Sequence, residues 1–275
     1  MCPAKVEIGE QRGFVIPIGG AEERVDHPVI LQKFVAVCGA ENANIVIIPT
    51  ASQLEDTGSD YIQVFKKLGV NKVVSLDINS REEANLSENI KALQQATGVF
   101  MTGGNQLRLS TILGGTALFQ MMRRANAAGV HIAGTSAGAA IMPEHMIAGG
   151  PKGAVPNEAG VTFAPGMGLI NKIILDQHFS QRNRLGRLLS AVAYNPFSSG
   201  IGIDEDTALF IGPDNQLEVI GSGSVTIIDP SGLAHSSMAD AARGESLTLI
   251  GMKLHMLSHG DQYNIDTRVA TPKSN

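Results

Sequence analysis

The fold is decided by the stretch His131-Ile132-Ala133-Gly134-Thr135-Ser136-Ala137-Gly138-Ala139-Ala140-Ile141-Met142. Its apolar beginning predicts a strand and residues 139–142 predict the start of a helix, with a G-x-S-x-G turn between them. A strand that enters a helix through so tight a turn is typical of a nucleophile elbow, because the turn exposes the middle hydroxyl, here that of Ser136. An ordinary turn of small residues is the alternative, since the chain is rich in Gly, Ser and Ala.

Four more short apolar runs precede this stretch, at residues 14–18, 45–48, 73–76 and 98–101. Between them, apolar residues recur at helical spacing, for example Tyr61, Val64, Phe65 and Leu68. Strands that alternate with helices predict an α/β fold with a doubly wound, mostly parallel sheet. Ligands of such sheets bind beyond the carboxyl ends of the strands. The places to search are therefore 19–20, 102–104 and 134–136.

The pattern changes after about residue 206. Short runs separated by Gly, Pro, Asp and Asn predict antiparallel C-terminal hairpins added to the edge of the sheet; they lie at 208–211, 217–220, 224–228 and 247–250. No linker divides the chain, so we expect one domain over 1–275. Residues 148–168 are rich in Gly and Pro and predict an irregular loop, either over a site or simply at the surface.

Composition excludes several classes of protein. Hydrophobic residues make up 43% of the 275 residues and the net charge is −5, which fits neither a disordered chain nor a protein that binds nucleic acid. Two cysteines cannot form a closed zinc site, and the pair His255 and His259 lacks a third ligand, so no metal is expected. No secretory signal or membrane-spanning run is evident, which predicts a cytoplasmic protein without a membrane partner.

A serine hydroxyl needs a base, and His178 is the best of the seven histidines. It follows the apolar run 173–175 at the expected carboxyl end of another strand, at the same edge of the sheet as Ser136. The base in turn needs an acid, which the segment Gly202-Ile203-Asp204-Glu205-Asp206 offers in three carboxylates. Alternation along a strand sends Asp204 and Asp206 to one face and Glu205 to the other, and the choice among them stays open.

Arginines follow His178 closely. Ser180 is expected to cap a helix with an apolar stripe from Leu185 to Val192, which places Arg182 in its first turn. The positive end of a helix disfavours a cation there, so a carboxylate ligand explains Arg182 better than a solvated basic face.

Taken together, four segments resemble the cyanophycinases, serine-type exopeptidases related to peptidase E, the aspartyl dipeptidase, and by fold to class I glutamine amidotransferases. The segments are Thr102-Gly103-Gly104-Asn105-Gln106, residues 134–138, residues 176–187 and residues 202–205. The similarity runs through about residues 10–230 in order and spacing, and its most specific part is the block from Asp176 to Arg187.

This resemblance implies a flavodoxin-like fold and hydrolysis of cyanophycin, a poly-aspartate whose side-chain carboxyls are joined to arginine, to β-aspartyl-arginine dipeptides. It implies Ser136 as nucleophile, His178 as base and Glu205 as orienting acid, with Asp204, Asp206 and Glu158 as alternatives for the acid. The amides of Gly104 and Ala137 would form the oxyanion hole. The implied substrate pocket contains Gln106, Asp176, Gln177, Arg182, Arg184 and Arg187, with Asp176 available to a substrate guanidinium. A homodimer is implied and no cofactor is needed.

Two other functions stay open: an aspartyl dipeptidase of the peptidase E type, and a binding protein on the same fold in which Ser136 is only a turn residue. Glutamine amidotransferase chemistry is disfavoured because the elbow carries no cysteine, and no G-x-G-x-x-G follows the first strand to bind a dinucleotide.

Overall fold

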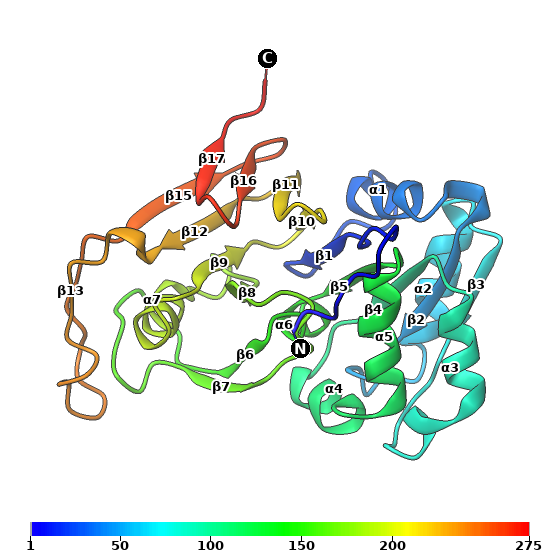
Figure 1. Ribbon diagram of the computed structural model, residues 1–275, viewed down its shortest axis with the longest axis horizontal. Coiled ribbons are helices and arrows are strands. Elements are labelled where there is room, and N and C mark those ends of the chain that lie inside the picture. Colours follow the sequence, from blue (N-terminus) through cyan, green and yellow to red (C-terminus); the bar gives the residue numbers. More distant parts are fainter. Residues whose placement is uncertain (1, 275) are drawn as a thin grey trace.

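Five parallel strands form one side of the larger sheet in the computed structural model, which describes residues 2–274 (Figure 1). In spatial order they are β3 (Lys72–Ser75), β2 (Asn44–Ile48), β4 (Gly98–Met101), β5 (His131–Thr135) and β1 (Val15–Ile18). Beyond β1 the sheet continues with antiparallel strands, namely β10 (Thr207–Ile211), β11 (Gln216–Gly221), β16 (Gln262–Asn264) and β17 (Val269–Thr271). The predicted α/β class, with a mostly parallel sheet and antiparallel C-terminal strands, is confirmed.

A second sheet holds the strand that precedes His178. In the described chain it has four strands, in the order β15 (Lys253–Leu257), β12 (Val225–Asp229), β9 (Ser199–Ile203) and β8 (Ile173–Gln177). We expected this strand in the same sheet as Ser136, and the later hairpins at the edge of that sheet. The first expectation is wrong, because β10 occupies the free side of β1 and β8 pairs with β9 instead. The second is wrong for the run 224–228, which pairs with β9, and for the run 247–250, which pairs with residues 235–236.

Two smaller β-ribbons complete the sheets. One joins β6 (His145–Gly149) to β7 (Thr162–Pro165), with a register shift between Ile147 and Gly149; the other joins β13 (His235–Ser236) to β14 (Leu249–Ile250). We expected the segment 148–168 to be irregular, but both of its ends take part in this ribbon. The ribbon is anchored to the core because Met146 and Ile147 are buried.

Helices cover both faces of the larger sheet (Figure 1). The α-helices are α1 (Val29–Val37), α2 (Thr57–Lys67), α3 (Ser87–Gln94), α4 (Gln106–Leu113), α5 (Ala117–Ala127), α6 (Ala137–Ala140) and α7 (Leu185–Tyr194). Short 3-10 turns lie at η1 (Ala40–Asn42), η2 (Glu83–Asn85) and η3 (Pro230–Gly232). The helix after Ser136 is a single turn, shorter than expected, because Pro143 follows and disfavours helical backbone in the residue before it.

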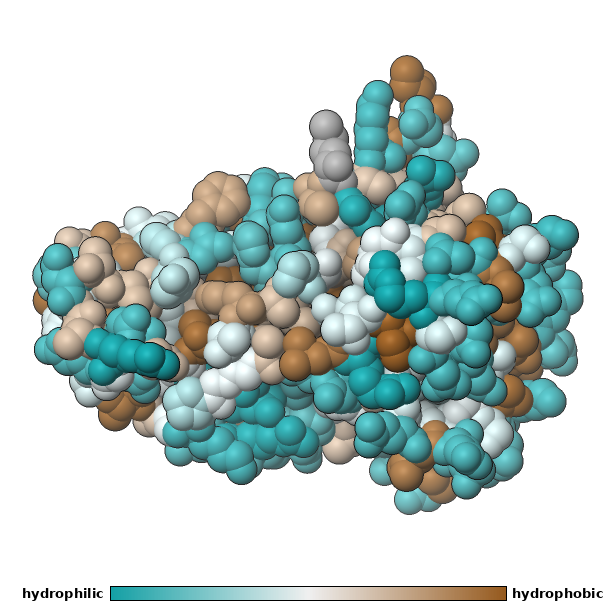
Figure 2. Space-filling model, turned by 90° about the horizontal axis from the view of Figure 1, so that it is seen from below, coloured by the Kyte–Doolittle hydropathy of each residue, from teal (hydrophilic) through white to brown (hydrophobic). Residues whose placement is uncertain are grey.

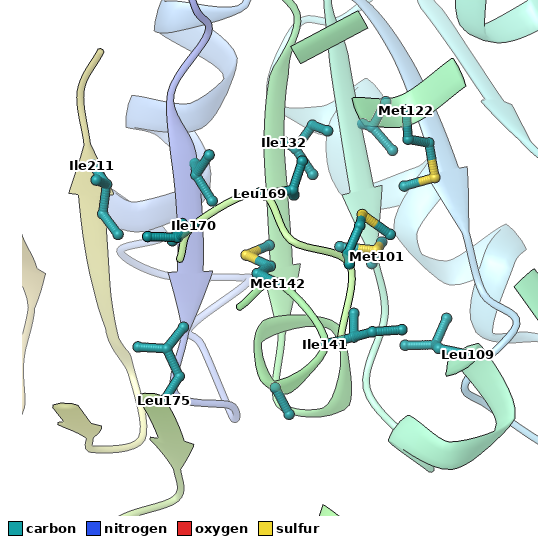
Figure 3. Packing of buried hydrophobic residues seen from close by; sticks show 14 of the residues in the cluster. Met101, Leu109, Met122, Ile132, Ile141, Met142, Leu169, Ile170, Leu175 and Ile211 are labelled. Atoms are coloured by element: carbon teal, nitrogen blue, oxygen red, sulfur yellow. The ribbon is translucent and has the colours of Figure 1, made fainter. Parts of the chain in front are cut away.

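Alternate residues of each central strand enter different hydrophobic clusters. In β2, Ile45 and Ile47 pack with α1 and α2 on one face, whereas Val46 and Ile48 pack with the helices on the other face. The second cluster also takes in Leu175 and Ile201 of the smaller sheet, and Figure 3 shows Ile141 and Met142, just after α6, lying between Leu175 and Leu109. This shared core supports the single-domain organisation that we propose for residues 1–275.

Four aromatic rings fill the core under α1 and α2. The Phe100 ring lies 4.7 Å from that of Tyr61, 5.3 Å from Phe65 and 5.9 Å from Phe34, measured between ring centroids. Such contacts add packing energy to the burial of the rings themselves.

The surface carries no large apolar belt on the face shown in Figure 2, where hydrophilic residues surround small separate groups of hydrophobic ones. Between residues 2 and 274, no helix is long and apolar enough to cross a membrane.

Replacing Phe100 by Ala should lower the free energy of unfolding by about 3–5 kcal/mol, since it leaves a cavity at the centre of the aromatic cluster. Phe197 offers a matched control because it is 68% exposed, so Phe197→Ala should cost well under about 1 kcal/mol. Urea denaturation of both variants measures the difference, and equal losses would contradict the assignment of this core.

Candidate active site

Ser136 sits in a strained turn between β5 and α6. Its φ of 53° and ψ of −107° are unusual for a residue with a side chain. Glycine is required on both sides: a Cβ on Gly134 would lie 2.6 Å from the carbonyl carbon of Gly138, and one on Gly138 would lie 2.4 Å from the carbonyl oxygen of Met101. The turn predicted from G-x-S-x-G is present, and the side chain of Ser136 is only half-buried.

His178 directly follows β8 and reaches the serine from the other sheet. Its Nε2 lies 2.9 Å from Ser136 Oγ. The residue has a φ of 47°, and its ring packs against Gly20, where an added Cβ would lie 2.3 Å from His178 Cε1. The structure thus brings the two predicted residues within hydrogen-bond distance, although the sequence pattern placed their strands in one sheet.

Glu205 meets the other side of the imidazole. Its Oε1 lies 2.6 Å from His178 Nδ1. The neighbouring carboxylates are committed elsewhere, since Asp204 accepts hydrogen bonds from the amide of Ser180 and the hydroxyl of Ser224, and Asp206 accepts one from the amide of Glu23. Glu158 accepts a bond from the amide of Gly244. Among the four acids left open by the sequence, Glu205 has the geometry to orient His178.

The charge state of His178 suits a base. Burial lowers its pKa below the ordinary 6.5, Glu205 opposes this shift, and the nearby cations of Arg182 and Arg184 add to it. The imidazole is therefore neutral at pH 7. A carboxylate can only accept, so Glu205 places the proton on Nδ1 and leaves the Nε2 lone pair facing the serine hydroxyl.

Backbone from the turn after β4 lies beside the nucleophile. A Cβ on Gly103 would lie 3.4 Å from Ser136 Cβ, and one on Gly104, whose φ is 142°, would lie 2.1 Å from the carbonyl oxygen of Ala51. Glycine alone fits this close approach. The turn that carries Gly104 therefore lies beside Ser136, and Ala137 follows Ser136 directly. The amides of Gly104 and Ala137 are thus close to the nucleophile, where an oxyanion hole is expected.

The arginine block differs from expectation. Helix α7 begins at Leu185, so Ser180 does not cap it, and Arg182 lies in an exposed turn before the helix. The reason is that the amide of Ser180 donates to Asp204, which holds residue 180 in that turn. Arg184 and Arg187 are not on a solvated face either, because both are buried.

Asp176 explains their burial. Its enclosed carboxylate accepts hydrogen bonds from Arg184 Nη1 at 3.1 Å, from Arg187 Nε at 2.5 Å and from Arg187 Nη2. A substrate guanidinium, which we expected here, would have to displace these arginines, so we propose that Asp176 positions the arginines instead of contacting the substrate. Burial lowers the pKa of Arg184 to about 10, while the charge of Asp176 raises it, so the side chain remains a cation at neutral pH.

Two glutamines of the expected pocket lie in different places. Gln177 Oε1 is 3.5 Å from Ser136 Oγ. Gln106 Nε2 donates to the carbonyl oxygens of Ile147 and Ala148 at 3.3 and 3.2 Å, which ties α4 to the bulge of β6. Gln177 therefore borders the nucleophile directly, whereas Gln106 connects the site to the β6–β7 ribbon.

Sequence reasoning missed a polar cluster after β1. The carboxylate of Glu22 is buried and accepts hydrogen bonds from the hydroxyls of Tyr61 and Thr135, and Arg24 Nη2 lies 3.4 Å from it. Thr135 is the residue before the nucleophile. Their position in the sequence was the available signal, because Glu22 and Arg24 lie within four residues after Gly19-Gly20, one of the strand ends where a ligand is expected.

No group of three or more His, Cys, Asp or Glu side chains within residues 2–274 is arranged to hold a metal ion. The arrangement of Ser136, His178 and Glu205 is that of a serine hydrolase: a nucleophile, a neutral base in contact with it, and an acid that orients the base.

Comparison with known proteins identifies the family. The sequence matches "Peptidase family S51" over residues 15–219, and the chain belongs to that family. A cyanophycinase of Trichormus variabilis is 46% identical over 260 residues, which cover 94% of this chain and 87% of that protein. A cyanophycinase of Geminocystis herdmanii is 43% identical over 259 residues, covering 93% and 95% of the two chains. The crystal structure of a peptidase from an acI-B1 actinobacterium has the same fold, with a TM-score of 0.68, 20% identity, and coverage of 93% of this chain and 98% of that one.

Labelling by a serine-directed fluorophosphonate should modify Ser136, at a rate that rises with pH through a midpoint below 6.5, because His178 accepts a proton only when neutral and its pKa is lowered. Glu205→Gln removes a group that raises this pKa, so the midpoint should move lower still. The maximal rate should fall about a hundred- to ten-thousandfold. Mass spectrometry of the adduct against pH measures both. Glu158→Gln is the matched control and should label like the wild type; the reverse ranking of the two variants would assign the acid to Glu158.

Gly20→Ala should abolish labelling, because the new methyl group occupies the space of the His178 ring. Gly69→Ala tests backbone strain alone, since Gly69 also has a positive φ, of 89°, but no atom lies within 4 Å of its added Cβ. We expect Gly69→Ala to lose only about 1 kcal/mol of stability and to keep its labelling rate. Normal labelling of a folded Gly20→Ala protein would contradict the position of the base.

Proposed function

We propose that this protein is a serine-type exopeptidase that hydrolyses cyanophycin to β-aspartyl-arginine dipeptides through an acyl-enzyme on Ser136. One observation carries the chemistry: Ser136 Oγ, His178 Nε2, His178 Nδ1 and Glu205 Oε1 form a continuous chain of contacts of 2.9 and 2.6 Å. The substrate comes from the similarity to cyanophycinases at 42–46% identity over more than nine-tenths of the chain.

The first half of the reaction forms the acyl-enzyme. Ser136 Oγ attacks the scissile carbonyl carbon while His178 Nε2 takes the hydroxyl proton, and Glu205 stabilises the resulting imidazolium. The carbonyl oxygen becomes an oxyanion, which the amides of Gly104 and Ala137 hold; one such donor is typically worth about 3–4 kcal/mol. Collapse breaks the peptide C–N bond, and His178 returns its proton to the leaving amine.

Water completes the cycle. His178 takes a proton from the water that attacks the acyl carbon, and collapse of the second oxyanion releases the carboxylate product as the proton returns to Ser136 Oγ. Each proton taken by His178 is given back, so Ser136, His178 and Glu205 leave the cycle unchanged. No cofactor takes part.

The arginines after β8 supply positive charge for the carboxylates of this substrate. Two arginines share the single carboxylate of Asp176, so the cluster keeps a surplus of one positive charge. Arg184 Nε is buried and, among the residues the structure describes, has no hydrogen-bond partner. An unpaired buried N–H is costly, so Arg184 is held here at some expense of stability, as groups in functional sites often are. Arg182, which is exposed, and Gln177, which borders Ser136, complete this part of the pocket.

The homodimer implied by the resemblance stays a prediction. We also propose a cytoplasmic location, which the free thiols of Cys2 and Cys38 support, because disulfides are rare in reducing compartments.

Purified protein incubated with cyanophycin should release β-aspartyl-arginine, measured by mass spectrometry, and Ser136→Ala should release none while keeping its melting temperature. Free dipeptides with N-terminal aspartate are the comparison substrate. Cleavage of those dipeptides without attack on the polymer would instead assign the aspartyl dipeptidase activity. Failure to cleave either substrate, together with no fluorophosphonate adduct, would assign a binding protein.

A further inference from the structure

A pocket of about 390 Å³ opens on Ser136 and His178 and is separate from the arginine block after β8. Its walls come from the loop after β1, the segment from β2 into α2, and the turn after β4; they include Arg24, Ser52, Asp60, Tyr61 and Gly104. Within the described chain, Arg24 is the one arginine or lysine that lines it. The pocket is therefore a second place where substrate can meet a cation beside the nucleophile.

The loop that carries Arg24 is fixed by its own neighbour. Glu23 Oε1 accepts hydrogen bonds from the backbone amides of Arg24, Val25 and Asp26 at 2.8, 2.7 and 3.2 Å. The amide of Glu23 donates to Asp206 Oδ1 at 2.9 Å. Asp206 follows Glu205 directly, so the loop is tied to the turn that supplies the orienting acid.

The guanidinium of Arg24 is held on one face and on one edge. Its Cζ lies 4.4 Å from the centre of the Tyr61 ring, and its Nη2 lies 3.4 Å from Glu22 Oε1. The Tyr61 hydroxyl in turn donates to Glu22, whose side chain is fully buried. Tyrosine, glutamate and arginine thus support one another.

This support leaves donors free. A guanidinium has five N–H groups in one plane, and stacking on a ring uses its face rather than its edges. The Arg24 side chain is 39% exposed, although it is anchored at two points. A pre-positioned arginine with a free edge is the usual means of binding a carboxylate in bidentate geometry.

We propose that Arg24 binds a carboxylate of the substrate in this pocket and so determines specificity, an inference that rests on the proposed hydrolysis of cyanophycin. Each repeating unit of that polymer carries the carboxylate of its arginine, and the chain end carries that of its last aspartate. Arg24 would bind either carboxylate in the same way. The alternative is that Arg24 serves only as the counter-ion of Glu22.

The test measures the KM and kcat of active enzyme, and the Kd of the Ser136→Ala protein, for a short soluble oligomer of β-aspartyl-arginine units. Arg24→Ala should raise KM and Kd at least tenfold and change kcat less than threefold. Because Arg24→Ala leaves Glu22 buried without its cation, the double variant Glu22→Gln/Arg24→Ala is measured beside it. It should regain the melting temperature but not the affinity.

Lys33→Ala is the matched control. Lys33 also joins an ion pair, 2.6 Å from Glu218, to a ring contact, 4.9 Å from the centre of Phe210, but it does not line the pocket. It should leave KM and Kd within twofold of the parent. A purely structural Arg24 would lower the melting temperature or kcat and leave Kd unchanged, and that result would overturn the proposal.

Two modified oligomers identify the source of the carboxylate. In one the arginine carboxylates are amidated, and in the other the terminal aspartyl carboxylate. If amidating one kind of carboxylate weakens binding by the parent protein but not by Arg24→Ala, that carboxylate is the ligand of Arg24. If both amidations weaken binding by Arg24→Ala as much as binding by the parent protein, the proposal is wrong. If wild-type protein neither binds nor hydrolyses the polymer, the proposed function itself fails. If wild-type protein does both and Arg24→Ala has the same KM and Kd, only this inference fails.

Discussion

The site depends on three consecutive carbonyl groups at the end of β1. Ile18 O accepts the amide of Ser136 at 2.9 Å, Gly19 O accepts that of His178 at 2.8 Å, and Gly20 O accepts that of Asp206 at 2.9 Å. The nucleophile, the base and the residue after the orienting acid come from three distant parts of the chain. Because neighbouring carbonyls lie a few ångströms apart, these bonds bring the three segments together at the edge where the two sheets meet. Glycine is needed at 20 because its φ is 103° and the imidazole occupies the space of a side chain.

Much of this arrangement follows from local patterns. The apolar runs at 14–18, 45–48 and 98–101 are strands of the larger sheet, since a strand buried on both faces needs no alternation. The turn at Ser136 was predictable because G-x-S-x-G is a local pattern, in which Gly134 is required by its close approach to Gly138 four residues later. The position of His178 at a strand end was predictable because the apolar run at 173–175 precedes it.

The rest depended on partners that no local pattern describes. Whether β8 joins β1 or forms a second sheet is decided by β10, which lies some thirty residues later and takes the free edge of β1. The burial of Arg184 and Arg187 depends on Asp176 facing them, and sequence composition assigns a run of arginines to the surface. Glu22 and Tyr61 are 39 positions apart, and no local pattern pairs the loop after β1 with helix α2. The choice of Glu205 over its neighbours followed from the turn after β9, where strand alternation no longer applies.

The surplus positive charge around Asp176 has a consequence for the base. Arg182 and Arg184 help to hold the pKa of His178 below its ordinary value in the free protein. An anionic ligand that neutralises these cations removes part of that effect, so the imidazole becomes more basic once the site is filled. Proton affinity at Nε2 is then coupled to occupancy. On the proposed function, the ligand would be the substrate itself, whose carboxylates would make His178 a stronger proton acceptor than it is in the free protein.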